Sequence, residues 1–90
     1  MLDFEFALNP NKPNPFNDET VISFVLPDAA NGTLTIYMVD GTMVQSIEGA
    51  WSKGYNEVML KASDLSAGGV YFYQLETETH SATRKMIVVE

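Results

Sequence analysis

Short runs of alternating apolar and polar residues constrain this chain more than any other feature. In residues 20–26, the side chains of Ile22, Phe24 and Leu26 share one face, and Pro27 follows. Alternation with a period of two is typical of a half-buried β-strand. Further strands are expected at residues 33–39, 42–47 and 55–60, at residues 70–75, where both faces are apolar or aromatic, and at residues 84–89. No window has the three- and four-residue apolar spacing of an amphipathic helix, so the pattern predicts an all-β fold.

The number and spacing of these runs indicate the architecture. With 90 residues, the chain has room for one small domain. About seven short strands at roughly 8–12-residue spacing predict an immunoglobulin-like antiparallel β-sandwich. Asp40-Gly41 predicts a two-residue type I′ hairpin turn, because that turn needs positive φ at both central residues. We expect Gly49 and Gly54 to bracket a loop that carries Trp51.

Tyr71 bears on the immunoglobulin-like form of the sandwich. It lies just inside a late strand, after Asp64-Leu65 and a glycine-rich turn. This arrangement resembles a tyrosine corner, in which the hydroxyl bonds back to the preceding turn, although the Asp-to-Tyr spacing differs from that of immunoglobulins. The alternative is a strand aromatic with a hydrated hydroxyl.

The N-terminal segment differs from the rest of the chain. We expect residues 1–17 to form an extended Pro/Asn-rich lead-in and linker, and residues 18–90 to form the β-sandwich. Three of the four prolines lie in this segment, and proline pushes the residue before it towards extended geometry. Within the proline-rich stretch of residues 8–17, Phe16 is the one large apolar anchor, and we expect it to pack against the sheet.

Composition excludes several classes of function. Five Lys plus Arg against twelve Asp plus Glu give a formal net charge of -7. Nucleic acid and anionic lipid are therefore poor partners, because binding to phosphates needs clustered basic side chains. There is no cysteine, which removes disulfides and thiolate sites. No apolar run approaches the roughly 20 residues that cross a bilayer, and residues 1–6 lack the cationic start of a secretory signal peptide.

Candidate catalytic and metal sites are weak. The one histidine, His80, stands beside Ser81 in a polar segment that we expect to be an exposed hairpin tip. Catalysis needs a base held rigidly against a nucleophile, which such a tip does not provide. Asp18-Glu19 or Asp28 could bind calcium through oxygen ligands, and the alternative is a solvated acidic surface. We expect no enzyme activity and no cofactor.

Two further features leave alternatives open. Trp51, with nearby tyrosines, could stack on a sugar, or it could pack in the core or at its rim. Arg84 and Lys85 stand together before the final apolar run. They form a local positively charged site. The alternative is that they are ordinary solvent-exposed charges at the end of a hairpin, where a lysine also protects an edge strand from aggregation.

Several short motifs occur in order along nearly the whole chain, from about Leu8 to Glu90. They are Pro13-Asn14-Pro15-Phe16-Asn17, Thr20-Val21-Ile22, Ile36-Tyr37, Asp40-Gly41, Gly54 before Val58, Asp64-Leu65, Gly69-Val70-Tyr71-Phe72-Tyr73 and Lys85-Met86-Ile87-Val88-Val89. Together they resemble the C-terminal sorting domain of the type IX (Por) secretion system of Bacteroidetes. The chain departs from the family at Gly68-Gly69, where one glycine is usual, and at Lys12, where an aromatic residue is typical.

The resemblance implies a non-catalytic secretion signal. An N-terminally fused cargo would enter the periplasm, and the type IX translocon with its outer-membrane shuttle proteins would pass it to the cell surface or the medium. A sortase-like cysteine peptidase would cut near or before Leu8. The terminal strand would carry much of the signal, because an exposed edge strand offers main-chain hydrogen bonds to a partner strand.

The same resemblance assigns roles to individual residues. The recognition residues would be Arg84, Lys85, Met86, Ile87, Val88, Val89 and Glu90. The structural motif residues would be Pro13, Asn14, Pro15, Phe16, Asp40, Gly41, Gly69 and Tyr71.

The alternative is an immunoglobulin-like accessory, carbohydrate-binding or spacer module of a cell-surface polysaccharide-degrading enzyme. In that case Trp51 and nearby tyrosines would touch glycan. Similar short sandwiches occur in flagellar hook-capping proteins, and the terminal Lys-Met-x-Val-Val motif is what separates sorting domains from them. The sequence does not predict an oligomeric state.

Overall fold

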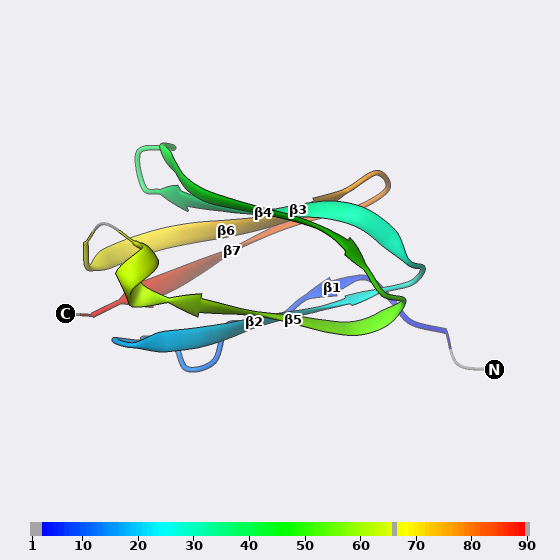
Figure 1. The fold of residues 1–90 in the computed structure, drawn as a ribbon, viewed down its shortest axis with the longest axis horizontal. Helices are drawn as coiled ribbons and strands as arrows, with labels where there is room; N and C mark the ends of the chain where they lie inside the picture. The colour runs from blue at the N-terminus through cyan, green and yellow to red at the C-terminus, as the bar shows by residue number, and fades with distance from the viewer. Residues whose placement is uncertain (1–2, 66, 90) are drawn as a thin grey trace.

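Two antiparallel sheets pack face to face in the computed structural model (Figure 1). The structure describes residues 3–65 and 67–89. Within these residues the smaller sheet has the order β1–β2–β5, and the larger has the order β4–β3–β6–β7. The elements are β1 (Ala7–Leu8), β2 (Glu19–Leu26), β3 (Ala30–Met38), β4 (Met43–Trp51), β5 (Gly54–Lys61), the 3-10 helix η1 (Ala62–Asp64), β6 (Gly69–Thr77) and β7 (Ser81–Val88). The predicted β-sandwich of seven strands is confirmed.

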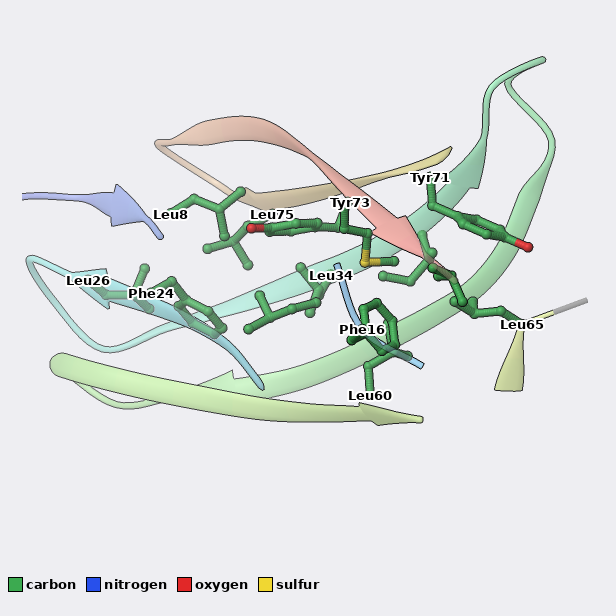
Figure 2. Close-up of a cluster of buried hydrophobic side chains, with 14 residues drawn as sticks. Leu8, Phe16, Phe24, Leu26, Leu34, Leu60, Leu65, Tyr71, Tyr73 and Leu75 are labelled. Atoms are coloured by element: carbon green, nitrogen blue, oxygen red, sulfur yellow. The ribbon is translucent and has the colours of Figure 1, made fainter. Parts of the chain in front are cut away.

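One face of each long strand contributes to the core between the sheets. The predicted inward residues of β2, Ile22, Phe24 and Leu26, are all fully buried, which confirms the period of two. Phe16 is also buried, as expected. Figure 2 shows the side chains of both sheets meeting in this cluster. The core residues are Leu8, Phe16, Ile22, Phe24, Leu26, Leu34, Ile36, Leu60, Leu65, Tyr71, Tyr73, Leu75, Met86 and Val88.

The turn between β3 and β4 differs from the prediction. Gly41 has a φ of +90°, but Asp40 does not have a positive φ, so the turn is not type I′. The Gly41 N–H donates to the Met38 carbonyl at 2.9 Å, which centres the turn on Val39-Asp40. The Asp40 carboxylate accepts the Thr42 N–H at 2.9 Å. Because aspartate can bond the backbone two residues on, it stabilises this turn without positive φ.

The expectation of a loop around Trp51 is wrong. Strand β4 continues through Gly49 to Trp51, and only two residues separate it from β5. The indole lies so close to Gly49 that a Cβ there would be 2.8 Å from the ring. Its Nε1–H donates to the Gly32 carbonyl at 3.0 Å, and its ring meets Phe24 edge-on at 5.2 Å. Gly49 therefore makes room for a ring, where the sequence suggested a turn.

Candidate recognition site on the terminal strand

Strand β7 lies at one edge of the larger sheet and pairs with β6. Since successive side chains of a strand point to opposite faces, the predicted recognition residues divide into two sets. Met86 and Val88 face the core, and they are 0% and 5% exposed. Lys85 and Ile87 face away from the core. Glu90 lies outside the described residues.

Arg84 and Lys85 do not form one charged patch. The Arg84 Nε–H donates to the carbonyl of Leu8 in β1, so this side chain reaches across to the smaller sheet. Lys85 lies opposite Phe72 of β6, on the outer face of the larger sheet. Adjacent residues in a strand point opposite ways, and here the two cations serve different surfaces.

The segment before β2 lies along the free edge of β7. We call residues 9–16 the strap. Phe16 forms a parallel bridge with Val88: its N–H donates to the Ile87 carbonyl at 3.0 Å, and its carbonyl accepts the Val89 N–H at 2.9 Å. The side chain of Asn14 accepts the Ile87 N–H at 2.9 Å. The prediction of an open main-chain edge is therefore wrong at Ile87 and at the N–H of Val89.

The strap is held by interactions with both sheets. Phe16 enters the core and is 2% exposed. The hydroxyl of Tyr73 in β6 donates to the Asn9 carbonyl at 2.6 Å, and burial raises the pKa of this tyrosine. The Asn11 side chain donates to the Thr20 hydroxyl in β2 at 3.1 Å. A buried polar group that is hydrogen-bonded in this way resists displacement, because opening would leave its partner unsatisfied.

A short stretch of the β7 edge stays uncovered. Ile87 directs its N–H and C=O away from β6. In an antiparallel pair every second residue of a strand does the same, so the main-chain groups of Lys85 and Thr83 also point away from β6. Within residues 3–65 and 67–89, these outward main-chain groups have no hydrogen-bond partner. Here β7 faces β1 across a groove of about 600 Å³, lined by residues 6–9 and 81–84. In the described part of β7, only this stretch of the edge is open to main-chain pairing with another strand.

Two motif residues shape the turn that leads into β6. The Tyr71 hydroxyl donates to the Ala67 carbonyl at 2.5 Å and accepts the Ala67 N–H at 3.2 Å. Tyr71 is buried, so the hydroxyl bonds back to the turn as in a tyrosine corner, and the hydrated alternative is not what the structure has. Gly69 begins β6 with a φ of +135°, a conformation that favours glycine.

His80 is not the exposed loop residue that the sequence suggested. Its ring stacks on Phe6 with a centroid distance of 4.7 Å, and the side chain is half-buried. Its Nδ1 lies 2.9 Å from the Thr79 hydroxyl, whereas the Ser81 hydroxyl accepts a 3.4 Å bond from Gln74. No arrangement of nucleophile, base and orienting group is built around this histidine in the described residues.

The aromatic residues considered for glycan binding lie on different surfaces. Trp51 is half-buried, and its indole N–H is bonded to the main chain. Tyr37 lies on the outer face of the larger sheet, where its hydroxyl donates to Gln74 at 3.4 Å. Tyr55 is exposed on the smaller sheet, opposite Val25. These three rings do not form a common platform for a sugar.

Residues 3–65 and 67–89 contain no cluster of three acidic or histidine side chains that could hold a metal ion. No helix within them is both long enough and apolar enough to span a membrane.

Sequence reasoning missed the asparagines that fasten the strap. Asn9 and Asn14 were read only as part of a proline- and asparagine-rich composition. Short amide side chains between prolines are well suited to bond a neighbouring backbone, because the prolines have no N–H to offer. That signal was present for Asn14, but its partner strand β7 begins more than 60 residues later in the chain, whereas the side chain of Asn9 donates to Ser23 in β2.

The fold and the strapped terminal strand define a small β-sandwich module with no recognisable catalytic centre in its described part. Residues 13–89 match the family model of the secretion system C-terminal sorting domain. The match covers most of the chain, and the protein belongs to this family of type IX secretion sorting domains. Membership implies a sorting signal for export across the outer membrane. No curated protein matches the chain.

Proposed function

We propose that this domain directs an N-terminally attached cargo protein to the type IX translocon and is then cut from it. The observation that carries the proposal is the family match over residues 13–89, which includes the second half of the strap and every strand from β2 to β7. A rigid sandwich suits a folded recognition signal, since its surface is fixed before the partner binds.

Recognition of the terminal strand runs through the side chains that face outward, Lys85, Ile87 and Val89. Val89 is 44% exposed, and Lys85 is also exposed. Met86 and Val88 hold the strand in the core, and Arg84 ties it to β1. The occupied main-chain groups of Ile87 support this division, because a partner cannot pair with them unless it displaces the strap.

The cut by a sortase-like cysteine peptidase falls before Ala7. Leu8 is only 4% exposed and its strand pairs with β2, so cleavage there would require local unfolding. Asp3 and Glu5 are exposed, and Phe4 is 39% exposed. Residues 3–5 therefore serve as the link to cargo, since Phe6 already packs against His80, and the cargo continues to the cell surface or the medium after the cut.

The position of this link supports the arrangement. The domain is 44 Å long, and the blue segment before β1 leaves it at the end opposite to the end of β7 (Figure 1). Cargo at that end leaves the terminal strand accessible to the translocon.

A fusion experiment tests the proposal. A reporter that carries its own general secretory signal is joined upstream of residues 1–90 and expressed in a host with a type IX system and in a matched host without a translocon. We expect reporter on the surface or in the medium of the first host and in the periplasm of the second. A reporter that stays in the periplasm of the competent host, with the domain intact to protease, contradicts the proposal.

A further inference from the structure

The outer face of the larger sheet carries a row of three large apolar side chains and one lysine, which crosses all four of its strands. Met43 of β4 lies opposite Tyr37 of β3. Phe72 of β6 lies opposite both Tyr37 and Lys85 of β7. Val70 of β6 and Ile87 of β7 form the next pair on the same face. We call the whole set the outer patch: Tyr37, Met43, Val70, Phe72, Lys85 and Ile87.

Burial of the neighbouring residues shows that the patch faces away from the core. Ile36, Tyr71 and Met86 are at most 2% exposed, so strand alternation directs the residues next to them outward. Val70 and Ile87 pair directly in the next row towards the end of β7. Of the patch, Met43 is 60% exposed and Val70 is 37% exposed. No other element of the described chain covers this face.

Charge is distributed unevenly over the same face. Thr33 of β3 lies opposite Glu48 on one side and Glu76 on the other, which makes an acidic row. That row is four residues from Tyr37 along β3, or about 13 Å at the rise of a β-strand. The apolar end therefore carries a cation, Lys85, while the other end carries two acids.

The geometry points to the outer patch as the docking surface for one component of the export machinery, a folded protein that presents apolar side chains and a carboxylate opposite Lys85. This inference rests on the proposed function, since it names the surface through which the sorting signal is bound. Aromatic and methionine side chains are enriched at the centres of protein interfaces. A lysine covered by such an interface needs an acidic partner, because an unpaired buried charge is costly.

A second copy of the chain fits this surface poorly. If two outer patches met about a two-fold axis, Lys85 of one copy would lie against Lys85 or against the apolar side chains of the other, depending on the direction of the axis, and in neither case would it meet a carboxylate. If the copies were turned so that Lys85 met Glu48 and Glu76, the apolar row would cover charged groups. Neither arrangement satisfies both the apolar side chains and the lysine, whereas an apolar partner surface with a carboxylate satisfies both.

A lipid surface also fits poorly. The chain has a net charge of -7, which opposes approach to anionic headgroups. Asp40 stands at the same end of the larger sheet, in the turn beside Val39, and its hydrogen bond to the Thr42 N–H lowers the pKa of its carboxyl. A carboxylate held ionised at the rim disfavours insertion of the patch into a membrane.

Matched variants of the reporter fusion test the inference. Met43→Ser and Met59→Ser change the same residue type at equal exposure, 60% and 59%, on the outer faces of different sheets. Lys85→Glu and Lys53→Glu change the charge equally, and Lys53 lies in the β4–β5 turn. We expect Met43→Ser and Lys85→Glu each to lower the surface-displayed fraction about tenfold, as truncation of an interface anchor does. The two controls should export as the unmodified fusion does.

Protease resistance of the domain in each fusion confirms folding before export is compared. Normal export of both patch variants overturns the inference, and so does an equal loss in Met59→Ser. A dimer of the fusion in sedimentation that Met43→Ser dissolves, or flotation with anionic phospholipid vesicles that Lys85→Glu abolishes, overturns the choice of partner. If the unmodified fusion itself is not exported, the proposed function fails first, so the two failures are distinguishable.

Discussion

The two open sides of the sandwich are closed in different ways. On one side, β7 and β1 are joined by the strap, whose Phe16 and Asn14 bond the edge of β7. On the other side, the chain passes from β4 to β5 through two residues, and no further strand lies beyond β4 in the described part of the chain. Edge protection is therefore concentrated on the strand that we propose carries the sorting signal.

The β4 side has weaker defences against unwanted pairing. The register of β3 and β4 shifts between Ile36 and Tyr37, which marks a bulge, and Glu48 is exposed on β4. Bulges and charges both discourage edge-to-edge association. Within the described residues, the side-chain oxygen of Gln45 is buried there without a hydrogen-bond partner, and so is that of Asn11 in the strap. The comparison shows that the strap bonds the edge of β7 directly, whereas the edge of β4 is protected only by a bulge and a charge.

The largest effect is expected when the strap loses its anchor. Phe16→Ala should lower the free energy of unfolding by about 3–5 kcal/mol, because it removes a fully buried ring and leaves a cavity. Phe72→Ala, at a half-buried position of the outer patch, should cost about 1 kcal/mol. Urea denaturation of both variants measures the difference. Equal losses would mean that the strap contributes no more than a surface ring.

On the β4 side, the close contact of Gly49 with Trp51 can be broken by one methyl group. Gly49→Ala should cost about 1–3 kcal/mol, because its Cβ would lie 2.8 Å from the indole. Gly41→Ala has no neighbour within 4 Å but a φ of +90°, so about 1–2 kcal/mol is expected from backbone strain alone. Tryptophan fluorescence during unfolding should shift in Gly49→Ala and stay unchanged in Gly41→Ala. A native spectrum in both would refute the contact.

Asn14 beside β7 and Asn56 beside the β4–β5 turn form a matched pair, and the loss of stability expected for each is smaller. Asn14→Ala removes the bond to Ile87, and Asn56→Ala removes bonds to Ser52 and Gly54 on the β4–β5 side. Each should cost about 1 kcal/mol. Only Asn14→Ala should promote self-association, because it opens the edge of β7. Light scattering at rising concentration distinguishes them, and equal association of both variants would contradict the role of the strap.

The smallest effect concerns the turn between β3 and β4. The Thr42 N–H lowers the pKa of the Asp40 carboxyl from its ordinary value of 3.8. Its contribution to stability is therefore present above pH 3.8 and is lost as the pH falls through the lower folded-state value. An NMR titration of this carboxyl should show a midpoint below 3.8. A midpoint at or above that value would contradict the turn geometry.

Local sequence patterns predicted much of the fold and less of the site. The period of two located β2 and its core residues, because burial on one face leaves that pattern in any single strand. The same period of two means that Arg84 and Lys85 point apart, a consequence that the prediction of one local positive charge missed. The prediction of a loop around Trp51 was wrong because Gly49 was taken as the sign of a turn. In the structure, glycine is needed at this position because the indole ring of Trp51 leaves no space for a Cβ.

The contact of the strap with β7 could not be predicted, because these two segments are distant in the sequence. Phe16 bridges Val88, and nothing near either residue encodes that pairing. The peptide bonds before Pro13 and Pro15 are cis, which the sequence also did not indicate. The outer patch is likewise built from four strands, so only the register reveals that Met43 and Lys85 belong to one row.

Amide hydrogen exchange along β7 tests most directly whether the strap closes the terminal strand. In the intact domain we predict slow exchange at Ile87 and Val89, whose N–H groups are bonded to Asn14 and Phe16. The N–H of Lys85 points to the same side without a partner in the described chain and should exchange fast. Exchange at Ile87 and Val89 as fast as at Lys85 would contradict the account.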